Sequence, residues 1–104
     1  ANVIFIVVNN GMYGTIRMHQ EREYPGRVSG THLANPDFVA LAKAYGGTGE
    51  LVTETSQFMD AFARARAAGK PALIEIRIDP EAITPSATLS GLRAQAEARD
   101  AEKA

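Results

Sequence analysis

The first hydrophobic run of the chain ends abruptly at two asparagines. Residues 3–8 are all apolar and either β-branched or aromatic, which predicts a strand buried on both faces, as in the middle of a parallel sheet. Asn9, Asn10 and Gly11 follow directly. Amide oxygens can ligate a hard cation, and a glycine-containing turn can present backbone N–H groups to phosphate. Because α/β proteins bind ligands at the carboxyl ends of their strands, this turn is the first candidate for a functional site.

Beyond the turn, the pattern predicts a short helix and then a long loop. Residues 13–21 are mostly polar and contain no proline, which indicates a helix that begins at Met12 or Tyr13. From residue 21 to residue 35 no periodicity persists, and glycine-containing turn signals recur. Loops of this length are commonly functional or mobile, so this one is expected to be either part of a lid or a surface loop.

Two amphipathic helices are predicted in the middle of the chain. The first has Asn35 as its N-cap and Pro36 at its first helical position, and it ends at a pair of glycines. The second begins at Thr55 or Ser56 and ends at Gly69. The apolar face of this second helix comprises Phe58, Ala61, Phe62 and Ala65.

Two further strands are expected. Residues 48–53 are compatible with a short strand. In residues 71–79, Leu73 is expected to be buried, and isoleucines at every second position alternate with Glu75 and Arg77. This alternation predicts one covered face and one partly wet face, which is typical of a strand toward the edge of a sheet.

The end of the chain predicts a helix on the surface. Residues 80–85 are a connector bracketed by prolines, and residues 86–104 are alanine-rich and charged. They indicate a marginal helix with a narrow apolar stripe. The order of elements is that of an α/β domain, with residues 1–85 as the domain and residues 86–104 as a helical tail. The stripe consists of Leu89, Leu92 and Ala96.

Composition and charge exclude several classes of function. A chain of 104 residues is at most one domain, and its net charge of −1, with acids and bases interspersed, favours neither nucleic acid nor an anionic membrane as a partner. The absence of cysteine excludes disulfides, thiolate zinc sites and thiol catalysis. The opening apolar run is too short to cross a bilayer and lacks the flanks of a signal peptide, so a cytoplasmic protein is expected.

The beginning of the chain indicates a piece of a longer protein. The chain has no initiator methionine and enters a strand that looks central almost at once, while the rest of the sequence offers few strands that could flank it. We therefore expect the N-terminal half of the α/β domain to be missing, and the remainder of the parent chain to be the partner of this one.

Residues 7–17, Val-Val-Asn-Asn-Gly-Met-Tyr-Gly-Thr-Ile-Arg, resemble the second half of the thiamine-diphosphate motif. The motif is that of the acetolactate synthase, pyruvate decarboxylase and benzoylformate decarboxylase family. Residues 35–38 and 70–76 also look like this family, so that the resemblance covers most of residues 2–80. The chain is most similar to the acetolactate-synthase-like large chains. The resemblance implies a three-layer, Rossmann-like α/β fold with a mostly parallel sheet.

The resemblance also implies two magnesium ligands separated by a glycine. Asn10 matches the family residue whose side-chain oxygen ligates Mg²⁺, and Met12 matches the position that gives a main-chain carbonyl to the same ion. Gly11 between them allows a tight turn. In the family the diphosphate completes the octahedral shell, which suits a hard cation that prefers oxygen ligands.

Three positions that follow would contact the cofactor itself. Tyr13 and Gly14 match family positions whose backbone N–H groups face the diphosphate at a helix start, where the helix dipole favours negative charge. Ile16 would lie against the cofactor. No catalytic residue is expected, because the chain lacks both the family's Gly-Asp-Gly element, which supplies another metal ligand, and its activating glutamate. The glutamates that do not match the activating one are Glu21, Glu23 and Glu75.

The resemblance implies a thiamine-diphosphate- and Mg²⁺-dependent enzyme that acts on a 2-keto acid. The reaction would be a decarboxylation, as in a lyase, or a carboligation to a second carbonyl compound, as in a transferase. The parent is expected to be a homodimer or homotetramer, since the family shares its active site between subunits, and this chain is not expected to be active alone. The alternative is a non-catalytic α/β fragment, or a module that serves in assembly or binds a nucleotide.

Other polar residues have plainer interpretations. His19 and His32 stand in polar surroundings without a partner at ligand spacing, which favours solvated surface positions over a metal or catalytic role. A group of basic residues before and within the loop could be a phosphate or substrate patch, although interspersed acids favour a solvated helix and loop. This group comprises Arg17, Arg22 and Arg27, together with Tyr24.

Overall fold

The computed structural model describes residues 2–103, which divide into two compact units. One unit comprises residues 2–9 and 35–78, and the other comprises residues 10–34 and 79–103. The chain passes from the first unit to the second between Asn9 and Asn10, so the two adjacent asparagines belong to different units. The domain boundary expected at residue 85 stays a prediction.

The first unit is built on a parallel sheet of three strands in the order β1-β3-β2. These strands are β1 (Ile4–Asn9), β2 (Thr48–Val52) and β3 (Ala72–Arg77). Ile4 and Thr48 both pair with Ala72, in parallel register on its two sides. The predicted parallel α/β sheet is therefore confirmed.

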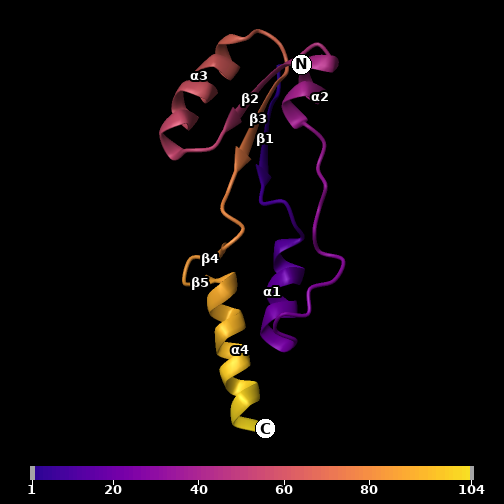
Figure 1. The fold of residues 1–104 in the computed structure, drawn as a ribbon. Helices are drawn as coiled ribbons and strands as arrows, with labels where there is room; N and C mark the ends of the chain where they lie inside the picture. Colours follow the sequence, from indigo (N-terminus) through magenta and orange to yellow (C-terminus); the bar gives the residue numbers. More distant parts are fainter. Residues whose placement is uncertain (1, 104) are drawn as a thin grey trace. The chain divides into compact units, whose positions relative to one another are not determined.

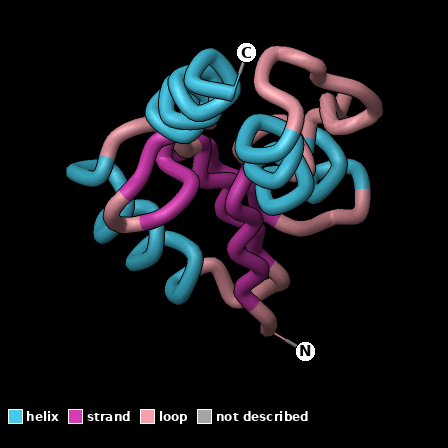
Figure 2. Tube along the Cα trace, turned by 90° about the horizontal axis from the view of Figure 1, so that it is seen from below, coloured by secondary structure: helices cyan, strands magenta, loops and turns pink. Residues whose placement is uncertain are grey.

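Helices lie on both faces of this sheet, α2 (Phe38–Ala44) on one and α3 (Phe58–Ala67) on the other (Figure 1). Figure 2 shows the same chain coloured by secondary structure, with the strands in magenta and the helices in cyan. A short 3₁₀ turn, Thr55–Gln57, precedes α3. The face under α3 is the core of the unit, and Ile74 of β3 is fully buried there. The apolar face predicted for α3 packs in this core, with Ala61 and Ala65 buried and Phe58 and Phe62 packed against them.

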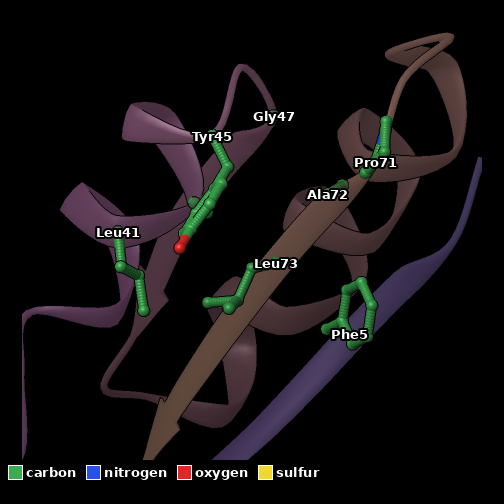
Figure 3. A pocket seen from close by; sticks show the side chains of 8 residues that line it. Phe5, Leu41, Tyr45, Gly47, Pro71, Ala72 and Leu73 are labelled. Atoms are coloured by element: carbon green, nitrogen blue, oxygen red, sulfur yellow. The ribbon is translucent and has the colours of Figure 1, made fainter.

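The face under α2 is more open. Leu41 and Tyr45 of the α2 segment stand opposite Leu73 of β3 and Phe5 of β1 around an apolar hollow of about 350 Å³ (Figure 3). Leu73, expected to be buried, is half-buried. Phe5 is 56 % exposed, so the expectation that the first strand is buried on both faces is wrong for the residues described. Among these residues β1 pairs only with β3, which leaves its other edge uncovered.

The position expected for β3 is also wrong, because β3 is the middle strand and not an edge strand. Glu75 was expected on the wetter face but is only 2 % exposed. Its carboxylate accepts hydrogen bonds from Asn9 Nδ2 and Arg77 Nε, each at 3.1 Å. These partners allow a charged group to be buried within the alternating pattern.

The start of α2 differs from its prediction as well. The N-cap is Asp37, whose Oδ1 accepts the backbone N–H of Ala40 at 3.0 Å. Asn35 was expected to be the cap, but its side-chain amide donates instead to Asn9 Oδ1 at 2.9 Å. The helix therefore begins at Phe38, two positions later than Pro36.

The second unit contains two helices and a small hairpin. The helices are α1 (Gly14–Glu23) and α4 (Leu89–Lys103), which pack along one another (Figure 1). The hairpin consists of β4 (Ala82–Thr84) and β5 (Ala87–Thr88), where the sequence predicted only a connector. The apolar stripe of α4 is confirmed in part, with Leu89 and Ala96 buried and Leu92 half-buried. None of the helices among residues 2–103 is long and apolar enough to cross a membrane.

Candidate functional site

The site segment predicted from the sequence is a tight turn followed by the start of α1, and it lies wholly in the second unit. Gly11 has a φ of +73°, in the left-handed region that glycine adopts without strain, as the predicted turn requires. Asn10 Oδ1 accepts the backbone N–H of Met12 at 3.2 Å. This contact folds the asparagine side chain back over the turn.

The long loop after α1 returns to pair with this turn. The backbone N–H of Tyr13 donates to the carbonyl of Thr31 at 2.8 Å, and the N–H of Leu33 donates to the carbonyl of Gly11 at 2.9 Å. These bonds flank an antiparallel bridge between Met12 and His32. The turn is therefore held from one side by residues 31–33 of the loop.

The same loop is also tied to the outer part of α1. The Thr31 side chain is 2 % exposed and donates its hydroxyl to Gln20 Oε1 at 3.1 Å. Gln20 Nε2 in turn donates to the carbonyl of Ser29 at 2.7 Å. Whether this loop acts as a lid over a bound cofactor stays a prediction.

The start of α1 leaves little room for a side chain. A Cβ on Gly14 would lie 2.8 Å from Asn10 Nδ2 and 3.3 Å from Cδ1 of Ile83, so both side chains crowd this glycine. Tyr13, the N-cap, makes no side-chain capping bond, and α1 has no acid in its first turn. The first turn of α1 therefore has no acid of its own to neutralise the positive end of the helix dipole.

A buried carboxylate joins α1 to α4 and to the loop. Glu21 is 0 % exposed, and Arg93 of α4 donates Nε to its Oε2 at 2.7 Å and Nη2 to its Oε1 at 2.6 Å. Arg17 Nε and the backbone N–H of Gly26 also donate to it, at 3.1 and 3.0 Å. Arg93 is the main cause that lowers the pKa of Glu21 to about 2; burial opposes this effect, and Gly26 and Arg17 reinforce it.

A second carboxylate holds the start of α4. Glu81, just before β4, accepts the backbone N–H of Ser90 at 3.0 Å and also accepts its hydroxyl. These hydrogen bonds lower the pKa of Glu81. Thr88 Oγ1 accepts the N–H of Gly91 at 3.0 Å, which caps the same helix. The hairpin and α4 are thereby fixed to each other.

The structure brings the predicted site residues together in one continuous stretch. Met12 is buried, whereas Tyr13 and Ile16 are exposed by more than half, at 53 % and 55 %. The N–H of Tyr13 is already donated to Thr31, so the phosphate-facing role predicted for it would require this hydrogen bond to open. Gly14 begins the helix, as the resemblance implies.

The donors fit part of a magnesium site. Asn10 Oδ1 and the Met12 carbonyl are neutral oxygens of the type that Mg²⁺ accepts. Within residues 2–103, no group of three or more His, Cys, Asp or Glu side chains could hold a metal. The described part of the chain therefore offers neutral oxygens at Asn10 and Met12 but no carboxylate cage. The magnesium half-site stays a prediction.

Sequence reasoning missed three residues that support this site: Thr31, Glu21 and Ile83. The sequence of the loop does not indicate that Thr31 is buried, because its contacts form only when the loop folds back onto α1. Glu21 and Arg93 are 72 residues apart, a separation at which charge patterning carries no signal. The two histidines are exposed, as predicted.

The fold is that of an α/β protein with a parallel sheet, and comparisons with known proteins identify its family. A family model described as "Thiamine pyrophosphate enzyme, C-terminal TPP binding domain" matches residues 1–76. The chain therefore belongs to the thiamine pyrophosphate enzyme family, within its C-terminal cofactor-binding domain.

Curated relatives agree with this assignment. The chain is 32 % identical over 75 residues to an acetolactate synthase large subunit of Parasynechococcus marenigrum, which covers 70 % of this chain and 12 % of that protein. It is 36 % identical over 88 residues to a 2-hydroxyacyl-CoA lyase of Arabidopsis thaliana, covering 75 % of this chain and 14 % of that one. The chain thus spans only a small part of the length of these relatives.

Proposed function

We propose that the protein carrying this chain is an enzyme that uses thiamine diphosphate and Mg²⁺ to act on a 2-keto acid. Its reaction would be decarboxylation or carboligation of the acetolactate-synthase type. The match of residues 1–76 to the cofactor-binding domain carries the most weight, because it includes the whole turn from Asn10 to Gly14. The similarity to both a synthase and a lyase supports the class of chemistry and not one particular reaction.

Each residue of the turn has a proposed role. Asn10, through its side-chain oxygen, and Met12, through its backbone carbonyl, would hold Mg²⁺. The first-turn N–H groups of α1, beginning with Gly14, would bind the diphosphate at the positive end of the helix. The N–H of Tyr13 would join these donors once its hydrogen bond to Thr31 opens, and Ile16, exposed beside this end, would lie against the cofactor.

These residues bind and orient, and they transfer no proton or electron themselves. Thiamine diphosphate, when bound, supplies the electron sink for decarboxylation. The remaining metal ligand and the activating glutamate would come from other parts of the enzyme, which we propose is a homodimer or homotetramer. The described residues are accordingly proposed to anchor the cofactor and not to catalyse the reaction.

The proposal is tested by replacing Asn10 in the intact protein that carries this chain. We expect Asn10→Ala to abolish Mg²⁺-dependent binding of thiamine diphosphate in calorimetric titrations. Asn10→Asp, which keeps an oxygen at this position, should retain part of the binding. Asn2→Ala, at an exposed asparagine of the same chain, is the matched control and should bind as the unaltered protein does.

Two results would contradict the proposal. If Asn10→Ala binds the cofactor with unchanged affinity and unchanged Mg²⁺ dependence, the metal assignment is wrong. If the intact, unaltered protein does not bind thiamine diphosphate at all, the chain belongs to a non-catalytic member of the family.

A further inference from the structure

The second unit contains contacts that cofactor binding does not directly use. Arg93 reaches across from α4 to Glu21 of α1, where it makes two hydrogen bonds to a carboxylate that is excluded from solvent. Arg99, farther along α4, donates Nη1 to the backbone carbonyl of Arg22 at 3.0 Å. The second half of α1 is thus held by two arginines of a single helix.

The first half of α1 is held by the hairpin. Ile83 of β4 lies so close to Gly14 that a Cβ on this glycine would be 3.3 Å from the isoleucine Cδ1. The Asn10 amide lies 2.8 Å from the same Cβ position. Asn10 and Ile83 therefore both lie close to Gly14, so the proposed metal ligand and the hairpin meet at the first residue of α1.

Residues 79–103 therefore contact α1 from its first residue to its last turn, although the family model ends at residue 76. The helix depends on such support. It has 10 residues, is mostly polar and lacks a side-chain cap, and isolated helices shorter than about 12–15 residues are marginal in water. Packing against other elements must supply most of its stability.

We propose that residues 79–103 form a brace that holds the diphosphate-binding end of α1 and the Asn10 side chain in their binding arrangement. Arg93 and Ile83 are its positioning residues: Arg93 fixes the helix through Glu21, and Ile83 fixes its start at Gly14. Neither residue is among those proposed above to contact the cofactor. The proposal rests on the function proposed above, and it adds that cofactor affinity depends on a segment outside the family match.

The test uses the intact protein with the variants Arg93→Ala, Arg93→Lys and Ile83→Ala. Arg66→Ala is the matched control, because it removes the same charge from an exposed position on α3 of the other unit. Hydrogen–deuterium exchange of peptides from residues 14–26 is measured without cofactor. Binding of thiamine diphosphate with Mg²⁺ is measured by calorimetry.

We expect Arg93→Ala and Ile83→Ala to speed exchange in residues 14–26 about tenfold, since local opening governs exchange. The Kd for the cofactor should rise about tenfold or more, the effect typical of partners that orient a metal ligand. Arg93→Lys should lie between Arg93→Ala and the unaltered protein, because lysine keeps the charge but cannot form the paired hydrogen bonds of arginine. Arg66→Ala should change neither quantity.

A double-mutant cycle distinguishes positioning through Glu21 from a general loss of packing. Adding Glu21→Gln to Arg93→Ala should raise the Kd little beyond the single variants, since both changes remove one interaction. Additive effects on Kd would overturn the role assigned to Arg93. Arg93→Lys keeps this part testable even if Arg93→Ala does not fold.

The remaining outcomes are equally decisive. Unchanged exchange in residues 14–26 of Arg93→Ala and Ile83→Ala would overturn the brace, as would faster exchange with an unchanged Kd. If the unaltered protein does not bind thiamine diphosphate, the proposed function fails. The exchange measurement, made without cofactor, would then still decide whether residues 79–103 hold α1.

Discussion

Asn9 donates its side-chain amide to the buried carboxylate of Glu75 at 3.1 Å, across the parallel pair β1 and β3. Its side-chain oxygen accepts a hydrogen bond from Asn35, which stands just before α2. Asn9 therefore fastens the end of the first strand to the sheet and to the loop that enters α2. Asn10, the next residue, begins the other unit and folds over the turn to Met12. The side chains of these two adjacent asparagines thus make their hydrogen bonds in different units: Asn9 in the unit of the sheet, and Asn10 in the turn before α1.

This division predicts that replacing Asn9 changes the stability of the fold more than replacing Asn10. Asn9→Ala removes a donor from a buried carboxylate and should lower the free energy of unfolding by about 1–3 kcal/mol, as measured by urea denaturation. Asn10→Ala removes a side chain that is hydrogen-bonded only within its own turn among the bonds described, and should change stability little. Equal stability of Asn9→Ala and the unaltered protein would show that the Asn9–Glu75 contact is not structural.

Replacing Gly14 should lower cofactor affinity without lowering the stability of the fold. In Gly14→Ala, the new Cβ would displace the Asn10 amide, which lies 2.8 Å away at the free end of a flexible side chain. The fold should tolerate this change, since alanine suits a helix better than glycine does. Mg²⁺-dependent cofactor affinity should fall about tenfold or more because Asn10 is moved.

Thr15→Ala, at the exposed next position of α1, is the control for Gly14→Ala and should bind cofactor normally. Calorimetry and thermal unfolding on the same samples separate the two effects. Normal affinity in Gly14→Ala would mean that the Asn10 side chain is not confined in the way the structure indicates.

Local signals in the sequence were sufficient to predict most of the elements. The apolar run before Asn9 is a strand, the face of Phe58 and Ala61 is a helix face packed on the core, and Gly11 takes the left-handed conformation that the turn needs. These features depend on residues close in sequence. The turn from Asn10 to Gly14 could therefore be placed before the helix from the sequence alone.

The errors concern partners that are distant in sequence. The alternation of Glu75 with isoleucines predicts a wetter face for this glutamate, because the local pattern does not show that Asn9, 66 positions earlier, hydrogen-bonds to its carboxylate. Asn35 was assigned as a helix cap, but its amide is bound to Asn9 and Asp37 caps the helix instead. Where a polar side chain has more than one possible hydrogen-bond partner, tertiary packing determines which partner it binds. A local sequence pattern does not contain this information.

Gly11 and Gly26 offer a comparison between two turns. Both have positive φ angles, +73° and +77°, and a Cβ on either would meet no atom within 4 Å. Alanine at either position should therefore cost only backbone strain, about 1–2 kcal/mol. Thermal unfolding should show a similar loss of stability in both variants. Calorimetry should show weaker cofactor binding only in Gly11→Ala, because this substitution strains the backbone between the two proposed metal ligands, Asn10 and Met12. Equal binding in both would indicate that the turn geometry at Gly11 is not needed for the metal.

The buried ion pair predicts how the second unit responds to acid. The groups that face Glu21 are Arg93 from α4, Arg17 from its own helix and the Gly26 N–H from the loop. Glu81 is a second acid near the two arginines and offsets part of their charge. Together the donors lower the pKa of Glu21 from 4.5 to about 2 in the folded protein.

A carboxylate with a lowered pKa in the folded state stabilises the fold above its unfolded pKa and loses this contribution as the pH falls toward the folded value. The contribution of Glu21 should therefore be complete above about pH 5 and should be lost between about pH 4.5 and pH 2. Its size is at most about 3 kcal/mol, since one pKa unit corresponds to about 1.4 kcal/mol. Exchange of residues 14–26, measured from pH 6 to pH 3 and corrected for intrinsic rates, should show this loss of protection. In Glu21→Gln, residues 14–26 should be less protected from exchange at pH 6, and their protection should depend less on pH. If protection falls as steeply with pH in this variant as in the unaltered protein, other carboxylates cause the acid sensitivity.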